Sequence, residues 1–518
     1  MSFIYGDSRE QVTLSTLEDG IASDNAVRLI DLIVDKLYQE DSSKYTLKGN
    51  KETGRPAYHP RHMLKLFVYG YMNRIPSSRR LEAECKRNLE LKWLLNNLCP
   101  DFKTIADFRK DNGDAVREMS LKFRFMLSNQ GLITGELMAL DGTKLKANAG
   151  SKEVSYDDLA SSLKDLDAEI ERYLSLLNRN DVQDDLEEIN AASLDTVDLI
   201  RAKIGELQAK QRELQDLQSK AAQSSRRKIN PTDPDSRMIV GHKEQFSGYN
   251  LQLIVDAAFK LIAAAQVRQT TNDRQELLPA LEDLKESLDI EPQTIVADKG
   301  YDNVAQLQQI DAAGRTEAIV SCNDEPRSSA GFGKWAFRYD EAKDRYYCPL
   351  GKELKPRGGV QKRKDRFAVV YQCKKSVCQS CEHRSRCASG KEGRIVTRYT
   401  DEKWVEAYRN KLQRPREQAL LRRRKAIVEH VFGVLKCWMG KIPLLLRGRD
   451  NVQTEIELYA TAYNLKRLIK LLGFDGVKAL IMAQWDDNRG FVAVFSAILF
   501  PKEPRWGNSR YQNQVLGD

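Results

Sequence analysis

The chain has 518 residues, of which 41% are hydrophobic and 30% are charged, and its formal net charge at pH 7 is +9. This length exceeds one compact domain, and the surplus positive charge suggests a polyanionic partner without establishing one. No run reaches the roughly 18 apolar residues that cross a bilayer, and the first residues lack a signal-peptide pattern, so composition argues against a membrane or exported protein and predicts a cytoplasmic one.

Residues 1–130 are predicted to form an all-helical domain. From His59 to Leu98 the apolar residues recur at spacings of three and four, which is typical of amphipathic helices. Pro60 marks a helix start, Pro76 marks a break between helices, and a further helix is expected near Thr104. Such a bundle can bind DNA through basic faces or serve as a packing or dimerisation module, and the pattern leaves both interpretations open.

A mixed α/β core is predicted from residues 131–150 and 230–334 together. Apolar runs at 137–140, 294–297 and 317–322 indicate strands, and the run from Gly248 to Thr270 indicates a hairpin of two strands. Helical patterns at 276–288 and 303–314 alternate with these strands. The order strand, hairpin, helix, strand, helix, strand predicts a mixed sheet covered by helices.

The core is interrupted at residues 151–229 by a predicted antiparallel helical hairpin. Two heptad seams, one from Leu159 to Leu177 and one from Val197 to Leu217, flank the polar turn at 178–190. The first helix is rich in Asp and Glu, whereas 403–449 contains thirteen Lys or Arg against three Glu. We expect the hairpin to be a structural spacer rather than a DNA-contacting arm, although its sequence leaves both functions open.

A second insertion, residues 335–395, carries five of the nine cysteines. A pair spaced CxxC within such a cluster suits tetrahedral Zn²⁺ with thiolate ligands, and a reducing compartment favours metal over disulfides. We therefore predict a structural zinc bound by four of the five, with His383 as a further candidate; an iron–sulfur cluster and unligated thiols are the alternatives. The five are Cys348, Cys373, Cys378, Cys381 and Cys387. Cys85, Cys99, Cys322 and Cys437 stand apart and are expected to be packed side chains.

Residues 396–472 are predicted to form the C-terminal helical part of the core. The chain is expected to be helical from Lys403 to Met439, and a further amphipathic helix is expected over 451–472. The tail, residues 473–518, shows no pattern that predicts structure.

Two aspartates directly follow predicted strands. Asp141 ends the apolar run at 137–140 and Asp298 ends the run at 294–297, and each has a glycine nearby that permits close approach to the backbone. On the helix that follows the cysteines, Lys425, Glu429 and Lys436 share one face. That set could be an intrahelical salt-bridge group. Three carboxylates, however, suffice to hold two Mg²⁺ ions for phosphodiester chemistry, with the lysines on substrate phosphates.

The three segments ALDGTK, ADKGYDN and VEHVFGVLK resemble the catalytic blocks of DDE transposases from bacterial insertion sequences. The resemblance spans most of the chain: an N-terminal helical domain, a split core and a cysteine-bearing insertion before the last acid. It implies a ribonuclease-H-like core that uses two divalent metal ions, Mg²⁺ or Mn²⁺, to cut transposon ends and join them to target DNA. Asp141, Asp298 and Glu429 would hold these metals.

One branch of that family has Tyr, Arg, Glu and Lys at set intervals around the last acid. Glu429 and Lys436 match this pattern, whereas the Arg position holds Lys425 and the Tyr position holds Arg422. The resemblance implies that both lysines act in the site. Asn272 and Asp273 also lie where the family often has polar residues near the site.

The resemblance further implies double-stranded DNA as the partner, both as terminal inverted repeats and as target. A homodimer or higher oligomer is expected on that DNA, in a bacterial cytoplasm and at the nucleoid when bound. A nuclease on the same core that cuts without joining, and a domesticated DNA-binding relative without activity, are the alternatives.

Overall fold

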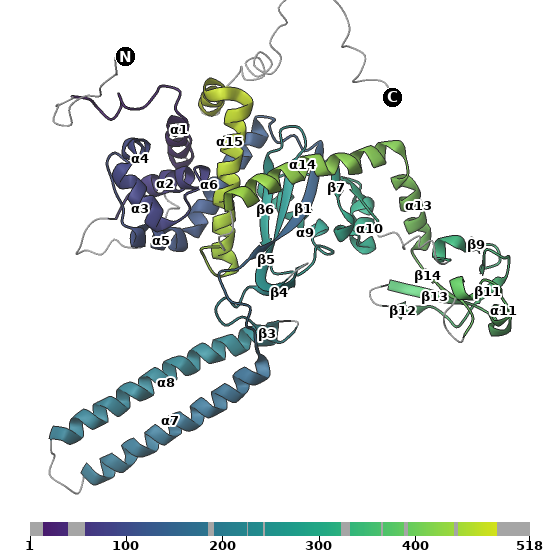
Figure 1. The fold of residues 1–518 in the computed structure, drawn as a ribbon, viewed down its shortest axis with the longest axis horizontal. Coiled ribbons are helices and arrows are strands. Elements are labelled where there is room, and N and C mark those ends of the chain that lie inside the picture. The colour runs from purple at the N-terminus through teal and green to yellow at the C-terminus, as the bar shows by residue number, and fades with distance from the viewer. Residues whose placement is uncertain are drawn as a thin grey trace, which may run out of the picture.

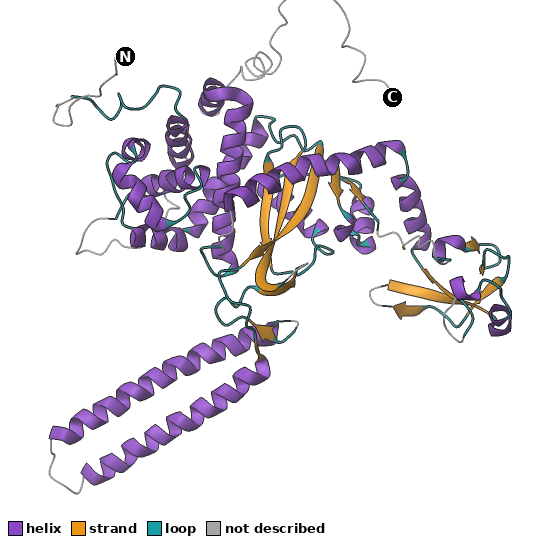
Figure 2. Cartoon of the chain, viewed as in Figure 1, coloured by secondary structure: helices purple, strands orange, loops and turns teal. Residues whose placement is uncertain are grey.

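The computed structural model describes residues 14–39, 57–184, 191–224, 226–241, 244–322, 332–363, 366–387, 392–439 and 444–483. It is a mixed α/β protein with one central sheet that is surrounded by helices. A long helical arm projects from this part, and a second sheet lies at the end of the molecule opposite the N-terminal helices (Figures 1 and 2). Most of the expected tail, from residue 484 on, and the tip of the expected turn, residues 185–190, lie outside the described residues. No helix of the described part is long and apolar enough to cross a membrane.

The N-terminal region is helical, as predicted. Pro60 begins α2, and α3 begins after the break at Pro76, which confirms both signals. The helix expected near Thr104 begins at Phe102, because the Asp101 side chain accepts hydrogen bonds from the backbone N–H groups of Lys103 and Thr104. The helices are α1 (Ala26–Gln39), α2 (Pro60–Met72), α3 (Ser78–Arg87), α4 (Leu89–Leu94), α5 (Phe102–Asp111) and α6 (Gly113–Asn129).

The central sheet contains the predicted strand, hairpin and two further strands. β5 pairs with β1 on one side and with β4 and β6 on the other, always antiparallel, whereas β1, β7 and β8 are parallel neighbours. The strands are β1 (Leu137–Lys146), β4 (Arg237–Val240), β5 (Gln245–Asp256), β6 (Ile262–Arg268), β7 (Thr294–Ala297) and β8 (Glu317–Val320), with helices α9 (Leu277–Leu288) and α10 (Val304–Ala313) and the 3-10 turn η2 (Lys299–Tyr301) between them.

The helical arm consists of α7 (Tyr156–Asp184) and α8 (Ala191–Gln223), and it projects away from the sheet (Figure 1). Strands β2 (Val154–Ser155) and β3 (Lys228–Ile229) pair at its base. The predicted seam is buried between the two helices, at Leu159, Leu163, Leu166, Ile170, Ile204, Leu207 and Leu217. The arm therefore has its own small apolar cores, separate from that of the central sheet.

The second sheet lies at the far end of the molecule from the N-terminal helices (Figure 1). It contains β9 (Arg338–Asp340), β10 (Arg345–Tyr347), β11 (Glu353–Pro356), β12 (Gln361–Arg363), β13 (Arg366–Cys373) and β14 (Ile395–Tyr399), with η3 (Lys334–Ala336), α11 (Lys375–Gln379) and α12 (Arg384–Cys387) beside it. β14 pairs with β13, so this sheet extends four residues beyond the boundary expected at 395.

The C-terminal helices confirm one prediction and correct another. The region expected to be helical, 403–439, consists of α13 (Glu402–Leu412) and α14 (Pro415–Met439), which are separate helices because Pro415 lacks an N–H group and disfavours a helical residue before it. The helix expected to end at 472 continues as α15 (Arg449–Ala483) through Gly473, whose φ of 68° kinks it.

Helix α15 joins the N-terminal helices to the sheet. It packs against α1, α2 and α6 on one side and β6 on the other, and Arg124 of α6 forms a buried ion pair with Glu457 at 3.1 Å. One continuous apolar core runs from Ile21 to Ile481. The two regions that the sequence suggested as separate modules therefore share one core.

Candidate active site

Asp141 and Asp298 lie on neighbouring strands. Asp298 directly follows β7, as predicted, whereas Asp141 lies within β1, which continues to Lys146 and does not end at residue 140. β1 and β7 are parallel, with Ala139 opposite Val296, and the same register two residues further on places Asp141 opposite Asp298. Neighbouring strands are about 4.8 Å apart. Each carboxylate is held by a nearby backbone N–H group: Gly142 donates to Asp141 Oδ1 at 2.8 Å, and Gly300 donates to Asp298 Oδ1 at 2.7 Å.

The electrostatics of Asp141 reflect this crowding. Burial raises the pKa of Asp141, and the negative charge of Asp298 raises it further. The guanidinium of Arg424, on α14, opposes that rise: its Nη1 donates to Asp141 Oδ2 at 2.7 Å. Two half-buried carboxylates that repel one another are an arrangement that a cation stabilises.

Glu429 is not gathered with the two aspartates. A helix turns about 100° per residue, so Glu429, five residues after Arg424, lies about 140° around α14 from the side chain that reaches Asp141. Glu429 is exposed, as are Lys425 and Lys436. In the described part of the chain, no three His, Cys, Asp or Glu side chains lie close enough together to hold a metal ion.

The intrahelical salt-bridge group considered for Glu429 is also not formed. Among the described side chains, neither Lys425 nor Lys436 pairs with Glu429 within ion-pair distance. The ammonium of Lys436 instead lies 5.7 Å from the centre of the Phe432 ring.

A polar network lies behind the aspartates, around Asp273. Its Oδ1 accepts three hydrogen bonds, from Lys144 Nζ at 2.9 Å, Asn250 Nδ2 at 2.8 Å and Gln252 Nε2 at 2.7 Å. The buried Tyr301 hydroxyl donates to Gln252 Oε1. Asn272, the other polar residue predicted near the site, is an exposed turn residue whose Oδ1 accepts from the backbone of Arg274.

This network explains the glycines that accompany the aspartates. A Cβ at Gly142 would lie 2.6 Å from Gln252 Nε2 and 2.8 Å from Asp273 Oδ1, both too close for a real side chain. A Cβ at Gly300 would lie 2.8 Å from Asp298 Oδ1. The sequence therefore indicated close approach at both glycines correctly, and the structure identifies the approaching groups.

Sequence reasoning missed two features of the site. The sequence pattern favoured Lys425 and did not single out Arg424. Arg424, however, lies four residues before the buried Val428 and therefore shares the helix face that packs on the sheet. Asn250 and Gln252 were read only as part of a strand. Two polar residues at alternate positions of an otherwise apolar strand point to one face, and that spacing was the available signal.

The five clustered cysteines lie in the second sheet and its loops, but among the described residues no three of them are arranged closely enough to hold a metal ion. Burial and a hydrogen bond with the Cys378 thiol raise the pKa of Cys373 to about 12, and burial, together with the nearby thiols of Cys378, Cys348 and Cys381, raises the pKa of Cys387. Backbone N–H groups of Lys352 and Arg394 donate to sulfur at 3.3 Å, to Cys348 and Cys378 respectively. All five are free thiols in the structure.

His383 and the four isolated cysteines lie apart from the cysteine cluster or contact other groups. The His383 ring packs edge-on against Phe332, with 5.8 Å between ring centres. Cys85 is buried, Cys99 and Cys322 are half-buried, and Cys437 is exposed. The expectation that all four isolated cysteines are packed side chains is therefore wrong for Cys437, which lies on the outer face of α14.

Comparison with known proteins gives two family matches. The family model described as Transposase domain (DUF772) matches residues 15–111, and the model described as Transposase DDE domain matches residues 224–465. No curated protein matches the sequence. Among solved structures, the chain is similar to the piggyBac transposase in a cryo-EM synaptic complex with hairpin DNA, with 7% sequence identity and a TM-score of 0.33 over 95% of this chain and 88% of that one.

The two family models together cover more than half of the chain, including helices α1 to α5 and, in chain order, the strands from β3 to β14. The chain therefore belongs to the DDE-type transposases of insertion sequences.

Proposed function

We propose that this chain cuts the ends of an insertion sequence and joins them to target DNA, with Asp141, Asp298 and Glu429 as its three acids. The observation that carries the proposal is the proximity of Asp141, within β1, to Asp298, which directly follows the parallel strand β7. Two neighbouring carboxylates, each near a glycine, offer oxygen ligands for hard cations, and Arg424 pairs with one of them.

We also propose that the central sheet is a ribonuclease-H-like core. Three antiparallel strands, β6, β5 and β1, are followed across the sheet by two strands parallel to β1. In this order the central strand β1 carries the first acid, and the second directly follows its neighbour β7.

The aspartates fit divalent metal ions such as Mg²⁺ or Mn²⁺. They offer oxygen ligands, and burial of Asp141 beside the negative charge of Asp298 raises its pKa, an effect that a bound cation would oppose. Two such ions would activate the attacking oxygen and stabilise the leaving oxygen of a phosphodiester. Glu429 would complete the ligand set only if α14 turned or moved relative to the sheet.

The residues of this chain position the DNA for two exchanges. In the first, a phosphodiester P–O bond of the strand is replaced by a P–O bond to water, which frees a 3′ hydroxyl. In the second, that hydroxyl replaces one oxygen of a target phosphodiester. Lys425 and Lys436 would hold phosphates on either side of the reacting group, and Arg424 keeps Asp141 in place.

A second candidate function is DNA binding without cleavage. It is favoured by one observation, the exposed position of Glu429 away from the aspartate pair. A nuclease that cuts without joining is distinguished from a transposase by an assay that detects strand joining.

The test uses the DNA that flanks the gene, which would contain the element's ends. Asp141→Asn, Asp298→Asn and Glu429→Gln are compared with Asp289→Asn, an exposed residue whose left-handed backbone (φ of 53°) suits Asn. We expect the first three to lose cleavage in Mg²⁺ while retaining DNA binding in a gel shift, and the control to retain both. Near-normal cleavage by any one of the three would remove that residue from the proposed site.

We further propose that the clustered cysteines bind one structural Zn²⁺. The backbone N–H groups directed at the sulfur atoms of Cys348 and Cys378 support this, since such donors stabilise thiolate ligands. Elemental analysis of the protein, prepared without chelators, should give one zinc per chain. Less than about half an equivalent would favour free thiols or another metal.

Double-stranded DNA, as terminal repeats and as target, is the proposed partner. A homodimer or higher oligomer on DNA is part of the same proposal, because two ends must be joined together. Light scattering of the protein with and without DNA that carries one end measures the subunit number directly.

A further inference from the structure

Three cations surround a small hollow beside the aspartate pair. The hollow has a volume of about 370 Å³ and lies between the residues that follow β8, the end of α13 and the first half of α14. Arg409, Arg422 and Lys425 line it, and no Asp or Glu does. None of the three cations forms an ion pair among the described residues.

The hollow opens at the same sheet edge as the acids. β7 and β8 are parallel, with Ala297 opposite Val320, so Ser321, which lines the hollow, follows β8 where Asp298 follows β7. The backbone N–H of Ser321 donates to the Ala297 carbonyl at 3.4 Å. A ligand in the hollow would therefore lie one strand away from Asp298.

Arg409 contributes an unsatisfied donor. Its Nε is buried and makes no hydrogen bond in the described structure, whereas Arg422 Nε donates to the Gln418 carbonyl at 3.3 Å. A buried guanidinium N–H without a partner is costly unless an acceptor binds there. Arg409 also contributes to the positive potential that, after burial, lowers the pKa of Lys334.

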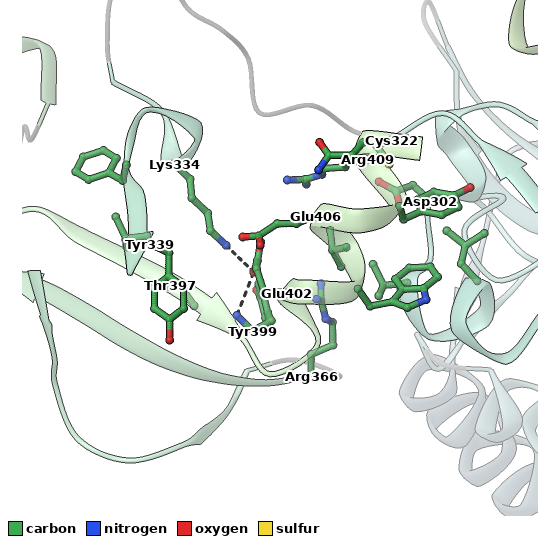
Figure 3. Close-up of a pocket in the computed structure, with 18 of the residues that line it drawn as sticks. Asp302, Cys322, Lys334, Tyr339, Arg366, Thr397, Tyr399, Glu402, Glu406 and Arg409 are labelled. Atoms are coloured by element: carbon green, nitrogen blue, oxygen red, sulfur yellow. Dashed lines mark hydrogen bonds and ion pairs between the residues drawn. The ribbon is translucent and has the colours of Figure 1, made fainter. Parts of the chain in front are cut away.

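A larger cavity continues from the hollow toward the acids. It has a volume of about 1060 Å³ and shares Cys322, Arg409 and Gln413 with the hollow (Figure 3). At its other side it reaches Gly300 and Asp302, in the turn that follows Asp298. A chain-like ligand could thus pass Arg409 and remain next to the aspartates.

We infer that Arg409, Arg422 and Lys425 bind consecutive backbone phosphates of the DNA strand that leaves the acid pair. Three cations without an acidic partner among the described residues make the hollow attractive to anions, and the planar guanidinium groups match phosphate oxygens. The inference rests on the proposed DNA-cutting function. It assigns new roles to Arg409 and Arg422, and it gives Lys425 a phosphate beside Ser321 rather than one beside Glu429.

The experiment measures how DNA affinity depends on salt. Affinities of the parent and of the triple variant Arg409→Gln, Arg422→Gln and Lys425→Gln are measured on a labelled duplex that contains one flanking end. Each lost phosphate contact reduces the slope of log K against log salt by about 0.9, so we expect a reduction of about 2 to 3. The control Arg423→Gln removes an exposed, unpaired cation of the same helix that does not line the hollow, and we expect its slope to change by less than about 0.5.

Two further variants and one further ligand keep the test decisive. Arg409→Lys and Arg422→Lys keep the charge and should retain the parent slope, which a purely structural role of these arginines does not predict. Should the triple variant fail to fold, the three single variants should each reduce the slope by about 0.9. Calorimetry with inorganic phosphate is the second arm.

The outcomes separate the inference from the function on which it rests. A slope that is unchanged in the triple variant, while the parent cuts DNA, overturns the phosphate hollow alone. Tight binding of inorganic phosphate together with an unchanged DNA slope would make the hollow a site for a free anion and would also overturn it. A parent that neither cuts nor joins DNA contradicts the proposed function itself.

Discussion

Replacing Gly142 by Ala tests whether the network around Asp273 holds the site rigidly. The added Cβ would lie 2.6 Å from Gln252 Nε2, 2.8 Å from Asp273 Oδ1 and 3.1 Å from the Tyr301 hydroxyl. Gln252 is 2% exposed and Tyr301 is fully buried, so neither can move into solvent. Relief therefore requires either a shift of β1 or the loss of a hydrogen bond.

The magnitude follows from these two routes. Overpacking a filled interior costs about 1–3 kcal/mol, and losing a hydrogen bond to a charged group costs about 1.5–3 kcal/mol. Because either route alone relieves the clash, we expect Gly142→Ala to destabilise the core by about 1–3 kcal/mol. A displacement of Asp141 by about 1 Å would also reduce cleavage on the order of 100-fold.

The assay compares Gly142→Ala with Gly150→Ala. Gly150 is exposed, has no atom within 4 Å of an added Cβ and should change stability by less than about 0.5 kcal/mol. Differential scanning calorimetry measures the shift in melting temperature, about 2–4 °C for each kcal/mol in a core of this size. A Gly142→Ala protein that melts within about 1 °C of the parent, and whose cleavage rate is within twofold of the parent rate, would show that the hydrogen-bond network around Asp273 rearranges at little cost. That result would contradict a rigid site.

Three further predictions concern the helices around the site. Lys436→Ala should slow single-turnover cleavage more than about tenfold if the lysine holds a phosphate, and a rate within twofold of the parent would reduce Lys436 to its contact with Phe432. Glu317 accepts hydrogen bonds from Arg416 and Lys411, at 2.8 and 2.7 Å, and these contacts lower its pKa to about 2 from 4.5. The ionised carboxylate therefore stabilises the fold above pH 4.5, and this contribution is lost as the pH falls toward 2. The deficit in melting temperature of Glu317→Gln should shrink over that pH range, and a deficit independent of pH would contradict this. Replacing residues 157–222 by a short Gly/Ser linker should leave DNA affinity equal or higher, because residues 156–223 hold 16 Asp or Glu against 8 Lys or Arg, and a tenfold loss of affinity in a gel shift would instead make the arm a DNA contact.

The sequence alone determined most strands of the central sheet, most helices and the two aspartates as candidates. Alternating and continuous apolar runs defined those strands, and heptads defined the arm, because these patterns depend on residues a few positions apart. Asp141 and Asp298 stood out because each directly follows an apolar run and has a glycine nearby. The strands of the second sheet and the continuation of β1 to Lys146 were not predicted.

Only the tertiary structure decided what surrounds that pair. The rotation of α14 on the sheet directs Arg424, rather than Glu429, to Asp141, and a helix pattern fixes relative faces but not which cation of the run 422–425 points inward. The approach of Asp273 to Gly142 and the gathering of Arg409 with Arg422 depend on packing between separate elements. Local periodicity carries no information about such contacts, because the distance between two elements is fixed by how their side chains fill the space between them.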